Sequence, residues 1–356
     1  MMSPAALREG TERSAYLDFV KGIAIVLVEL GHCIQYGSGQ AVINTASFFE
    51  DKLFRLIYSF HMPLFMLVSG YVFFWSVSRR TPGQTAWRQI RGLLIPTVCW
   101  TVTYRVYLQI TAFASGEPLS FAWLEALPTE IWSSHWFFWA VLWCSFLVLA
   151  VRMWGQDRLW LHGLFCAGLL LVPNTLITNC FSYVFMYPYF VAGYALNRKG
   201  FHGISAKRAW SWGAVLLVIF LLLFPHFSYD AYIYTTRISL TDAAQPIYQM
   251  ELDLFRWVIG FVGSGLALLL IYGLWRGICC PWFQRSVCYL GRRTLALYVV
   301  SSYLNFELLI PVTSDFPPNY GLNLLEAAVV MLLAVGITWL LERFRWSRIV
   351  YLGRGA

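Results

Sequence analysis

Long apolar blocks alternate with short polar segments along the whole chain. A typical block is AVLLVIFLLLF, from Ala214 to Phe224, and blocks of about 20 residues match the length that a helix needs to cross a hydrocarbon core of about 30 Å. Ten such blocks are expected to form helices, over residues 15–36, 54–77, 90–113, 135–153, 159–173, 182–197, 209–226, 254–276, 287–311 and 321–341. The runs are continuous rather than alternating, which excludes the strands of a membrane β-barrel. The pattern predicts an all-α, polytopic integral membrane protein.

The cations in the segments between the blocks predict its orientation. Twenty Lys and Arg residues fall in the N-terminal tail and in every second segment, against four in the alternate segments. Cytoplasmic loops carry an excess of these residues, so we expect ten crossings with both termini in the cytoplasm. Residues 1–14 and 342–356 are then cytoplasmic tails of a single membrane domain, 15–341. The first block is expected to remain as a membrane helix, because no small-residue cleavage site follows it.

Composition narrows the class of protein further. The chain is 59% hydrophobic and 12% charged, whereas a soluble domain carries about 25% charged residues. The net charge of +8 is accounted for by the cytoplasmic rim, with anionic lipid as a partner, and no nucleic-acid partner is expected. The eight cysteines show no metal-ligand spacing, so no metal is expected.

Four ionisable residues in the first block are the main chemical signal. Lys21 and His32 are 11 residues apart, about three helical turns, and so share one face. Asp18 and Glu29 each precede one of them by three residues, a spacing at which helical side chains interact. Two interpretations stay open: structural pairs, or a general base at His32 with an anion-binding Lys21 further along the helix.

The second block favours the functional interpretation. His61 lies in an apolar run next to Pro63, which is expected to kink the helix. By the predicted orientation, His61 reaches the same membrane depth as His32. Three more ionisable residues are expected at that depth: Arg105, Glu307 and Glu326. Because charges inside a membrane are costly and usually face the protein interior, we predict one polar cavity open toward the outer face.

An arginine pair on the predicted cytoplasmic side is a candidate anion-binding site. Arg88 and Arg91 have the planar donor fork that suits phosphate, although ordinary positive-inside charge explains them equally well. A hydroxyl-activating histidine on one side and a phosphate anchor on the other suggest group transfer across the membrane.

Three stretches resemble the membrane acyltransferase 3 family, in particular its fucose 4-O-acetylase and exopolysaccharide acetylase branch. They are YLDFVKGIAIVLVELGH, FRLIYSFHMPLFMLVSGYVF and HWFFWAVLW. The family's opening motif, a basic residue and then His after ten residues, matches Lys21 and His32. Its Ser-Gly-aromatic landmark matches Ser69, Gly70 and Tyr71, and the late run YLGRRTLALYVVSSYL also resembles the family.

The resemblance implies a ten-helix transferase of the bacterial inner membrane that moves an acetyl group from cytoplasmic acetyl-CoA to a glycan hydroxyl outside. His32 would be the catalytic base or acyl relay, with Glu29 as its orienter. The CoA side would be attended by Lys21, Arg88, Arg91, Ser69 and Gly70. The acceptor, a polysaccharide or lipid-linked sugar, would meet His61, Tyr71, Arg105, Trp136, Phe137, Glu307 and Glu326. A polysaccharide synthase is a candidate partner.

Departures and alternatives accompany this interpretation. Lys21 stands where relatives usually carry Arg, and Ser301 where the late motif usually carries His. A glycan or small-solute transporter would use the same polar cavity, and a succinyl donor would fit as well as acetyl. The outer segment from Phe227 to Asp253 is either a lid over the site or a connector.

Overall fold

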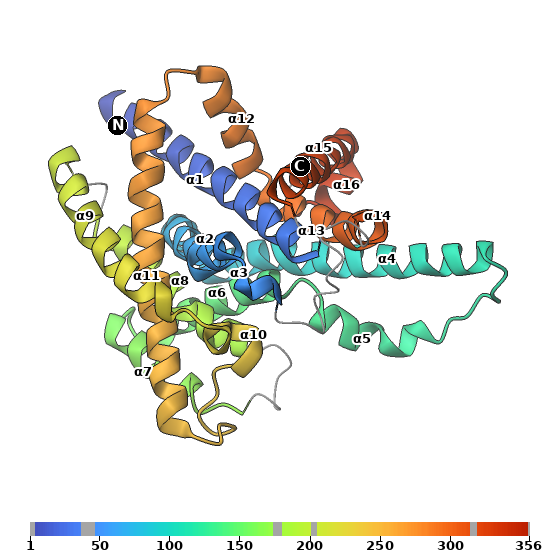
Figure 1. The fold of residues 1–356 in the computed structure, drawn as a ribbon, viewed down its shortest axis with the longest axis horizontal. Helices are drawn as coiled ribbons and strands as arrows, with labels where there is room; N and C mark the ends of the chain where they lie inside the picture. Colours follow the sequence, from blue (N-terminus) through green and yellow to red (C-terminus); the bar gives the residue numbers. More distant parts are fainter. Residues whose placement is uncertain (1–3, 37–46, 174–179, 201–204, 314–318, 355–356) are drawn as a thin grey trace. The chain divides into compact units, whose positions relative to one another are not determined.

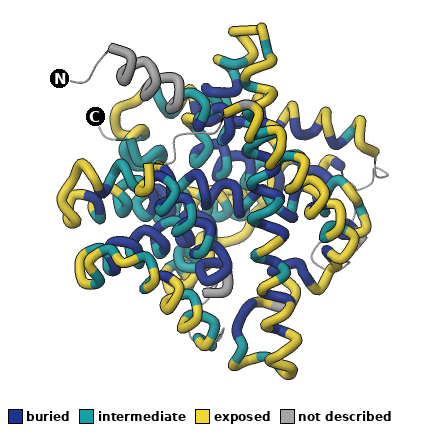
Figure 2. The backbone as a smooth tube through the Cα atoms, turned by 90° about the vertical axis from the view of Figure 1, so that its left-hand side faces the viewer, coloured by how far each residue is buried: buried dark blue, intermediate teal, exposed yellow. Residues whose placement is uncertain are grey.

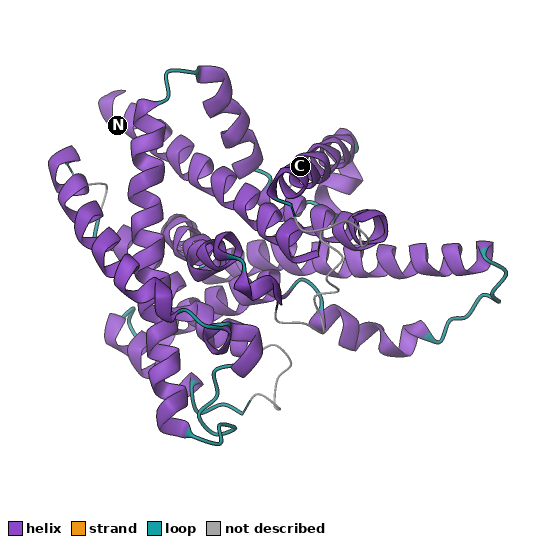
Figure 3. Cartoon of the chain, in the orientation of Figure 1, coloured by secondary structure: helices purple, strands orange, loops and turns teal. Residues whose placement is uncertain are grey.

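The computed structural model is built from helices (Figure 3). It describes residues 4–36, 47–173, 180–200, 205–313 and 319–354, and no strand occurs among them. The α-helices labelled in Figure 1 are α1 (Pro4–Tyr36), α2 (Lys52–Arg79), α3 (Pro82–Gln89), α4 (Ile95–Ala114), α5 (Trp123–Ser133), α6 (Trp136–Trp154), α7 (Leu159–Leu169), α8 (Cys180–Arg198), α9 (Ala206–Leu223), α10 (Ile233–Thr236), α11 (Pro246–Gly277), α12 (Pro281–Gly291), α13 (Thr294–Leu304), α14 (Ile310–Thr313), α15 (Tyr320–Arg343) and α16 (Arg345–Val350). The prediction of an all-α protein is confirmed for the described residues.

Six described stretches are long and apolar enough to cross a membrane. They are Lys52–Arg79, Trp136–Trp154, Lys207–His226, Pro246–Gly277, Thr294–Thr313 and Tyr320–Arg343. The other predicted blocks are also helical over most of their length, in α1, α4, α7 and α8. Multiple apolar helices therefore support a multi-pass membrane protein, while the count of ten and the placement of the termini stay predictions.

The block expected as one helix over 287–311 is instead interrupted. Helix α12 ends at Gly291, and the chain turns at Arg292 and Arg293 before α13 begins. The turn is closed by two backbone bonds, in which Arg292 N–H donates to Cys288 O (3.0 Å) and Arg293 N–H donates to Leu290 O (2.9 Å). A π-helical turn, Asn305–Leu309, follows α13. These interruptions are not visible in an apolar pattern, because both sides of the turn remain apolar.

The chain divides into two compact units. Unit 1 comprises Met1–Val68, Lys199–Thr236 and Met250–Thr338, and unit 2 comprises Ser69–Arg198, Arg237–Gln249 and Trp339–Ala356. The two units are described separately below.

In unit 1, α1 packs along α12 and α13 (Figure 1). Two glycines permit this close crossing. A Cβ on Gly22 would lie 2.0 Å from Val287 O, and a Cβ on Gly291 would lie 1.7 Å from Asp18 O. Each helix thus presents a glycine to the backbone of the other, as small residues commonly do where membrane helices approach closely.

In unit 2, α6 packs against α3, α7 and α8. Gly70 on α2 is the point of closest approach to α8, because a Cβ there would lie 1.9 Å from Phe190 O. The absence of a side chain at Gly70 thus lets the backbones of α2 and α8 approach closely.

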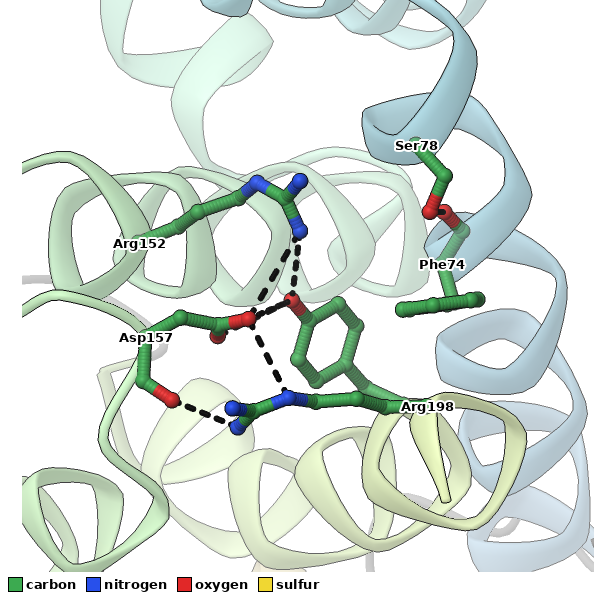
Figure 4. Close-up of polar contacts among 6 residues, drawn as sticks. Phe74, Ser78, Arg152, Asp157 and Arg198 are labelled. Carbon is green, nitrogen blue, oxygen red and sulfur yellow. Dashed lines mark hydrogen bonds and ion pairs between the residues drawn. The ribbon is translucent and has the colours of Figure 1, made fainter. Parts of the chain in front are cut away.

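A polar cluster closes the connection between α6 and α7 (Figure 4). Asp157 has a positive φ of 58°, which Asp tolerates better than most residues. Its Oδ2 lies 3.6 Å from Arg152 Nη1 and 3.3 Å from Arg198 Nε. Tyr194 donates its hydroxyl to the same carboxylate at 3.0 Å. One carboxylate therefore joins the ends of α6 and α8 to the intervening turn.

Some helices are exposed over long stretches, drawn in yellow in Figure 2, and many of the exposed side chains are large and apolar. In the apolar window of Lys207–His226 only 11% of the residues are buried, and Leu221 and Leu222 are 60% and 68% exposed. Water penalises such a surface, whereas lipid tails do not. The exposure is what a lipid-facing helix requires.

Candidate active site

The second half of α1 and the first half of α2 bring the two predicted histidines into one neighbourhood in unit 1. The His32 ring stacks on Tyr36, with centroids 5.5 Å apart and planes 17° apart. The ring of Tyr58, on α2, meets His32 edge-on at 6.5 Å and His61 at 4.5 Å. Tyr58 therefore lies between the two histidines, and sequence reasoning did not single it out.

The hydrogen bonds of Tyr58 determine which nitrogen of His32 is available. Tyr58 Oη lies 3.4 Å from His32 Nδ1. The single hydroxyl hydrogen of Tyr58 is used in a hydrogen bond to Gln35 Oε1 at 3.3 Å. His32 must then donate from Nδ1 to the tyrosine oxygen. The Nε2 atom consequently keeps its lone pair, as a general base requires.

Gly31 explains how Tyr58 reaches this position. A Cβ at Gly31 would lie 2.8 Å from Cε2 of Tyr58. The glycine that precedes His32 in the sequence thus leaves the surface of α1 open to the tyrosine ring. This gives a physical role to the Gly-His pair of the opening motif.

Glu29 is completely buried, with a relative exposure of 0%, and its carboxylate is bound by other partners than His32. Asn305 Nδ2 donates to Glu29 Oε2 at 3.4 Å, and the Cys33 thiol lies 3.6 Å from Oε1. Ser301, on α13, lies beside the same carboxylate, and its hydroxyl donates to Tyr298 O at 3.4 Å. The structure therefore connects Glu29 to α13 and the π-turn that follows it, and it connects His32 to Tyr58.

His61 is buried and bonds to its own helix. Its Nδ1 lies 2.8 Å from Ile57 O, and since a carbonyl only accepts, Nδ1 is the protonated nitrogen. His61 is 3% exposed, whereas His32 is partly exposed. Between these two histidines, His32 is thus the one more accessible to a reactant.

The first half of α1 carries the charged pair that the spacing predicted. Lys21 Nζ lies 2.8 Å from Asp18 Oδ1, so the i,i+3 ion pair is confirmed. Arg292 Nη1, from the turn after α12, lies 3.9 Å from Asp18 Oδ2. One carboxylate thus lies beside two cations, and all three side chains remain partly exposed.

The two C-terminal glutamates behave differently. Glu326, on α15, is 5% exposed, and Thr313 lies beside it. Its neighbour Ala327 packs against Cys33 in the same buried cluster. Glu307, on the π-turn after α13, is exposed. Of the two, only Glu326 therefore lies within the buried part of unit 1 that contains Cys33.

The remaining predicted acceptor residues lie in unit 2. Tyr71 packs edge-on against Trp75 at 5.6 Å, and Trp136 meets Phe137 at 6.0 Å at the start of α6. Arg105 forms an ion pair with Glu130. Arg105 is thus neutralised by a carboxylate of α5.

The two arginines of unit 2 that were predicted to bind the acyl donor, Arg88 and Arg91, lie close together in the sequence. Arg88 is exposed near the end of α3, and Arg91 follows in the π-turn Ile90–Leu94. Partial burial, and then the nearby Arg80 and Arg91, lower the pKa of Arg88. No hydrogen bond or ion pair of Arg88 or Arg91 occurs among the described residues. The predicted Ser69 is half-buried one position before Gly70.

Several site residues were missed by sequence reasoning. Tyr58, Gln35 and Asn305 carry the hydrogen bonds described above, yet none of them is ionised at neutral pH. Ser301 was given little weight because it replaces a histidine, but it lies beside Glu29. The available signal was their spacing: Gln35 follows His32 by three residues, and Asn305 follows Ser301 by four.

The apolar helices of membrane-spanning length support a multi-pass membrane protein, and among buried polar side chains His32 contacts Tyr58. The model of a known family, the acyltransferase domain, matches residues 14–343. The chain therefore belongs to the acyltransferase 3 family, and it is an acyltransferase.

Two curated relatives support this membership over most of the chain. Both are nodulation proteins NolL, one from Mesorhizobium japonicum and one from Sinorhizobium fredii. The first is 27% identical over 81% of this chain and 75% of its own length, and the second is 30% identical over 81% and 77%. No solved structure is significantly similar to the chain.

Proposed function

We propose that this acyltransferase moves an acetyl group from cytoplasmic acetyl-CoA to a hydroxyl of a glycan on the outer side of the bacterial inner membrane. The observation that carries the proposal is the contact of 3.4 Å between His32 Nδ1 and Tyr58 Oη. In the tautomer that donates from Nδ1 to this oxygen, Nε2 has the lone pair that takes the proton of a sugar hydroxyl. General-base assistance of this kind contributes about 10²- to 10⁴-fold to a rate.

The reaction balances with one histidine. As the sugar O–H loses its proton to His32 Nε2, its oxygen attacks the thioester carbonyl. The C–S bond then breaks, and the CoA thiolate leaves and takes the proton back from the imidazolium. The products are the sugar ester and CoA thiol, and His32 returns to its starting form.

Tyr58 and Gln35 are the positioning residues of this proposal. Gln35 is 7% exposed and accepts a hydrogen bond from the Tyr58 hydroxyl. The tyrosine oxygen can therefore accept a hydrogen bond from His32. This role replaces the orienting role expected of Glu29. Glu29 then serves as the anchor through which α1 holds Asn305.

The arginines of α3 and the following π-turn are proposed to bind the phosphates of the donor. Three like charges, Arg80, Arg88 and Arg91, create a local positive potential that an anion relieves. Arg is suited to phosphate because its donors form a planar fork. In unit 1, Lys21, which pairs with Asp18, is likewise proposed as an anion-binding residue.

Aromatic rings near His32 support a sugar acceptor. Tyr36 stacks on His32 and in turn meets Phe306 at 5.4 Å. Flat apolar rings beside a few polar groups are typical of small-molecule sites.

Purified protein in lipid nanodiscs provides the test. With labelled acetyl-CoA and the glycan fraction of the native membranes, we expect alkali-labile label on the glycan. His32→Ala should lower this transfer at least about 100-fold, whereas His226→Ala, a change at an exposed histidine, should leave it unchanged. Wild-type transfer in the His32→Ala variant at normal expression would refute the assignment. Labelled succinyl-CoA in a parallel reaction identifies the acyl group.

A further inference from the structure

A fully buried ion pair lies on α11, away from the residues assigned to the reaction. Arg256 Nη1 lies 2.7 Å from Asp253 Oδ1, and each side chain is only 1% exposed. Burying two charges costs several kcal/mol per ion by order of magnitude, and this cost is offset only when further hydrogen bonds satisfy them. The other partners of Arg256 are therefore informative.

The remaining donors of Arg256 bind the backbone of one outer segment. Nε donates to Ala231 O at 3.0 Å, and Nη2 donates to Asp230 O at 2.7 Å and to Tyr232 O at 3.5 Å. Three consecutive carbonyls thus converge on one guanidinium. A lysine has no planar fork with which to reproduce this arrangement.

A second arginine secures the start of the same segment. Arg55, on α2, donates from Nε to Phe227 O at 3.0 Å and from Nη2 to Phe224 O at 3.4 Å. The segment 224–232 is therefore bound by arginines of two different helices. Of the two interpretations left open, this described part fits a fixed cover better than a loose connector.

Tyr232 links the segment to the site around His32. Its ring meets Tyr58 at 5.8 Å and Phe49 at 5.4 Å. Its hydroxyl lies beside the side chain of Gln35, which accepts a hydrogen bond from the Tyr58 hydroxyl. Burial raises the pKa of Tyr232, so the hydroxyl remains neutral.

We propose that Arg256 is a positioning residue for the acyl transfer. By fixing the carbonyls of Asp230, Ala231 and Tyr232, it holds the Tyr232 ring against Tyr58 and the Tyr232 hydroxyl beside Gln35. These two neighbours orient Tyr58, and Tyr58 orients His32. The inference rests on the proposed function and extends it to a residue that does not touch the reactants.

A double-mutant cycle tests whether Arg256 acts through Tyr232. Arg256→Lys and Tyr232→Phe should each lower kcat for glycan acetylation up to about tenfold, the scale of one lost hydrogen bond, with the KM for acetyl-CoA unchanged. The double variant should be no slower than the slower single variant. Glu251→Gln, an exposed change on the same helix, should have no effect.

The kinetic outcomes are distinct. Multiplied effects in the double variant, or an unchanged kcat in Arg256→Lys, would overturn the inference while leaving the proposed function in place. Absence of any acetyl transfer by the wild-type protein would instead remove the proposed function on which the inference rests.

A labelling experiment measures the position of the segment without using activity. Ala231 is 2% exposed, so Ala231→Cys in a Cys279→Ser/Cys280→Ser background should react slowly with a membrane-impermeant maleimide. Adding Arg256→Lys should accelerate labelling severalfold at unchanged thermal stability. Equal labelling rates with and without Arg256→Lys would show that Arg256 does not hold the segment.

Discussion

In the first half of α1, Asp18 and Lys21 form an ion pair that stays partly exposed, whereas in the second half Glu29 is fully buried and bonded to neutral groups. The spacing of acid and base is the same in both halves. Asp18 and Lys21 form the ion pair that their spacing predicts. Glu29 and His32 instead contact residues of other helical segments, Asn305 and Tyr58. The difference follows from desolvation: a partly exposed pair keeps much of its hydration, while a buried carboxylate needs several close donors.

The largest effect is expected from disrupting the contact between α12 and the part of α1 that contains Asp18. Gly291→Ala places a Cβ against Asp18 O, so α12 must move away from α1. Overpacking of this kind costs about 1–3 kcal/mol, and we expect the thermal unfolding midpoint in detergent to fall by several degrees.

Gly336→Ala, on α15, is the matched control for that variant. No heavy atom lies within 4 Å of a Cβ at this position, and alanine is favoured over glycine in a helix by about 0.5–1 kcal/mol. Its midpoint should stay the same or rise. Equal losses in the two variants would contradict the role of the crossing.

A smaller effect, on rate alone, is expected in the second half. Tyr58→Phe keeps the ring but removes the oxygen that faces His32 Nδ1. One hydrogen bond is worth about 0.5–1.5 kcal/mol, so kcat for acetylation should fall up to about tenfold with little change in thermal stability. Tyr229→Phe alters an aromatic residue that is 40% exposed, and it should keep the wild-type kcat. A Tyr58→Phe enzyme at full rate would show that His32 does not depend on this tyrosine.

The smallest effect is expected from Asp18→Asn. Partly exposed ion pairs contribute about 0–1 kcal/mol, so stability should change little. The substitution leaves the charges of Lys21 and Arg292 without their carboxylate, and the KM for acetyl-CoA should fall about twofold at low salt and recover at high salt, because salt screens exposed charges. An increase in this KM would indicate that Asp18 itself assists the donor.

The sequence predicts the helices better than it predicts the partners within the site. Continuous apolar runs determine α2, α6 and α11, and helical spacing correctly pairs Asp18 with Lys21. Depth along a helix was also inferred, but depth does not identify a neighbour: Arg105 forms an ion pair with Glu130, and Glu307 is exposed.

The missed residues share a physical explanation. Tyr58, Gln35 and Asn305 are neutral, so a search for costly intramembrane charges passes over them. Which of these groups meets His32 or Glu29 depends on how helices rotate and cross, and glycines such as Gly31 control that packing. The sequence shows where a glycine lies on a helix, but it does not show which residue of another helix packs against that glycine.

The contact between Glu29 and Asn305 has a consequence for biosynthesis. The two residues are separated by 276 positions, and at translation rates of about 5–20 residues per second Asn305 emerges roughly 15 to 50 s after Glu29. During that interval α1 lacks α12, α13 and the side chains that satisfy its carboxylate. The nascent chain must therefore shelter its first helix, beside the insertion machinery or at the membrane surface, until the last third of the protein is made.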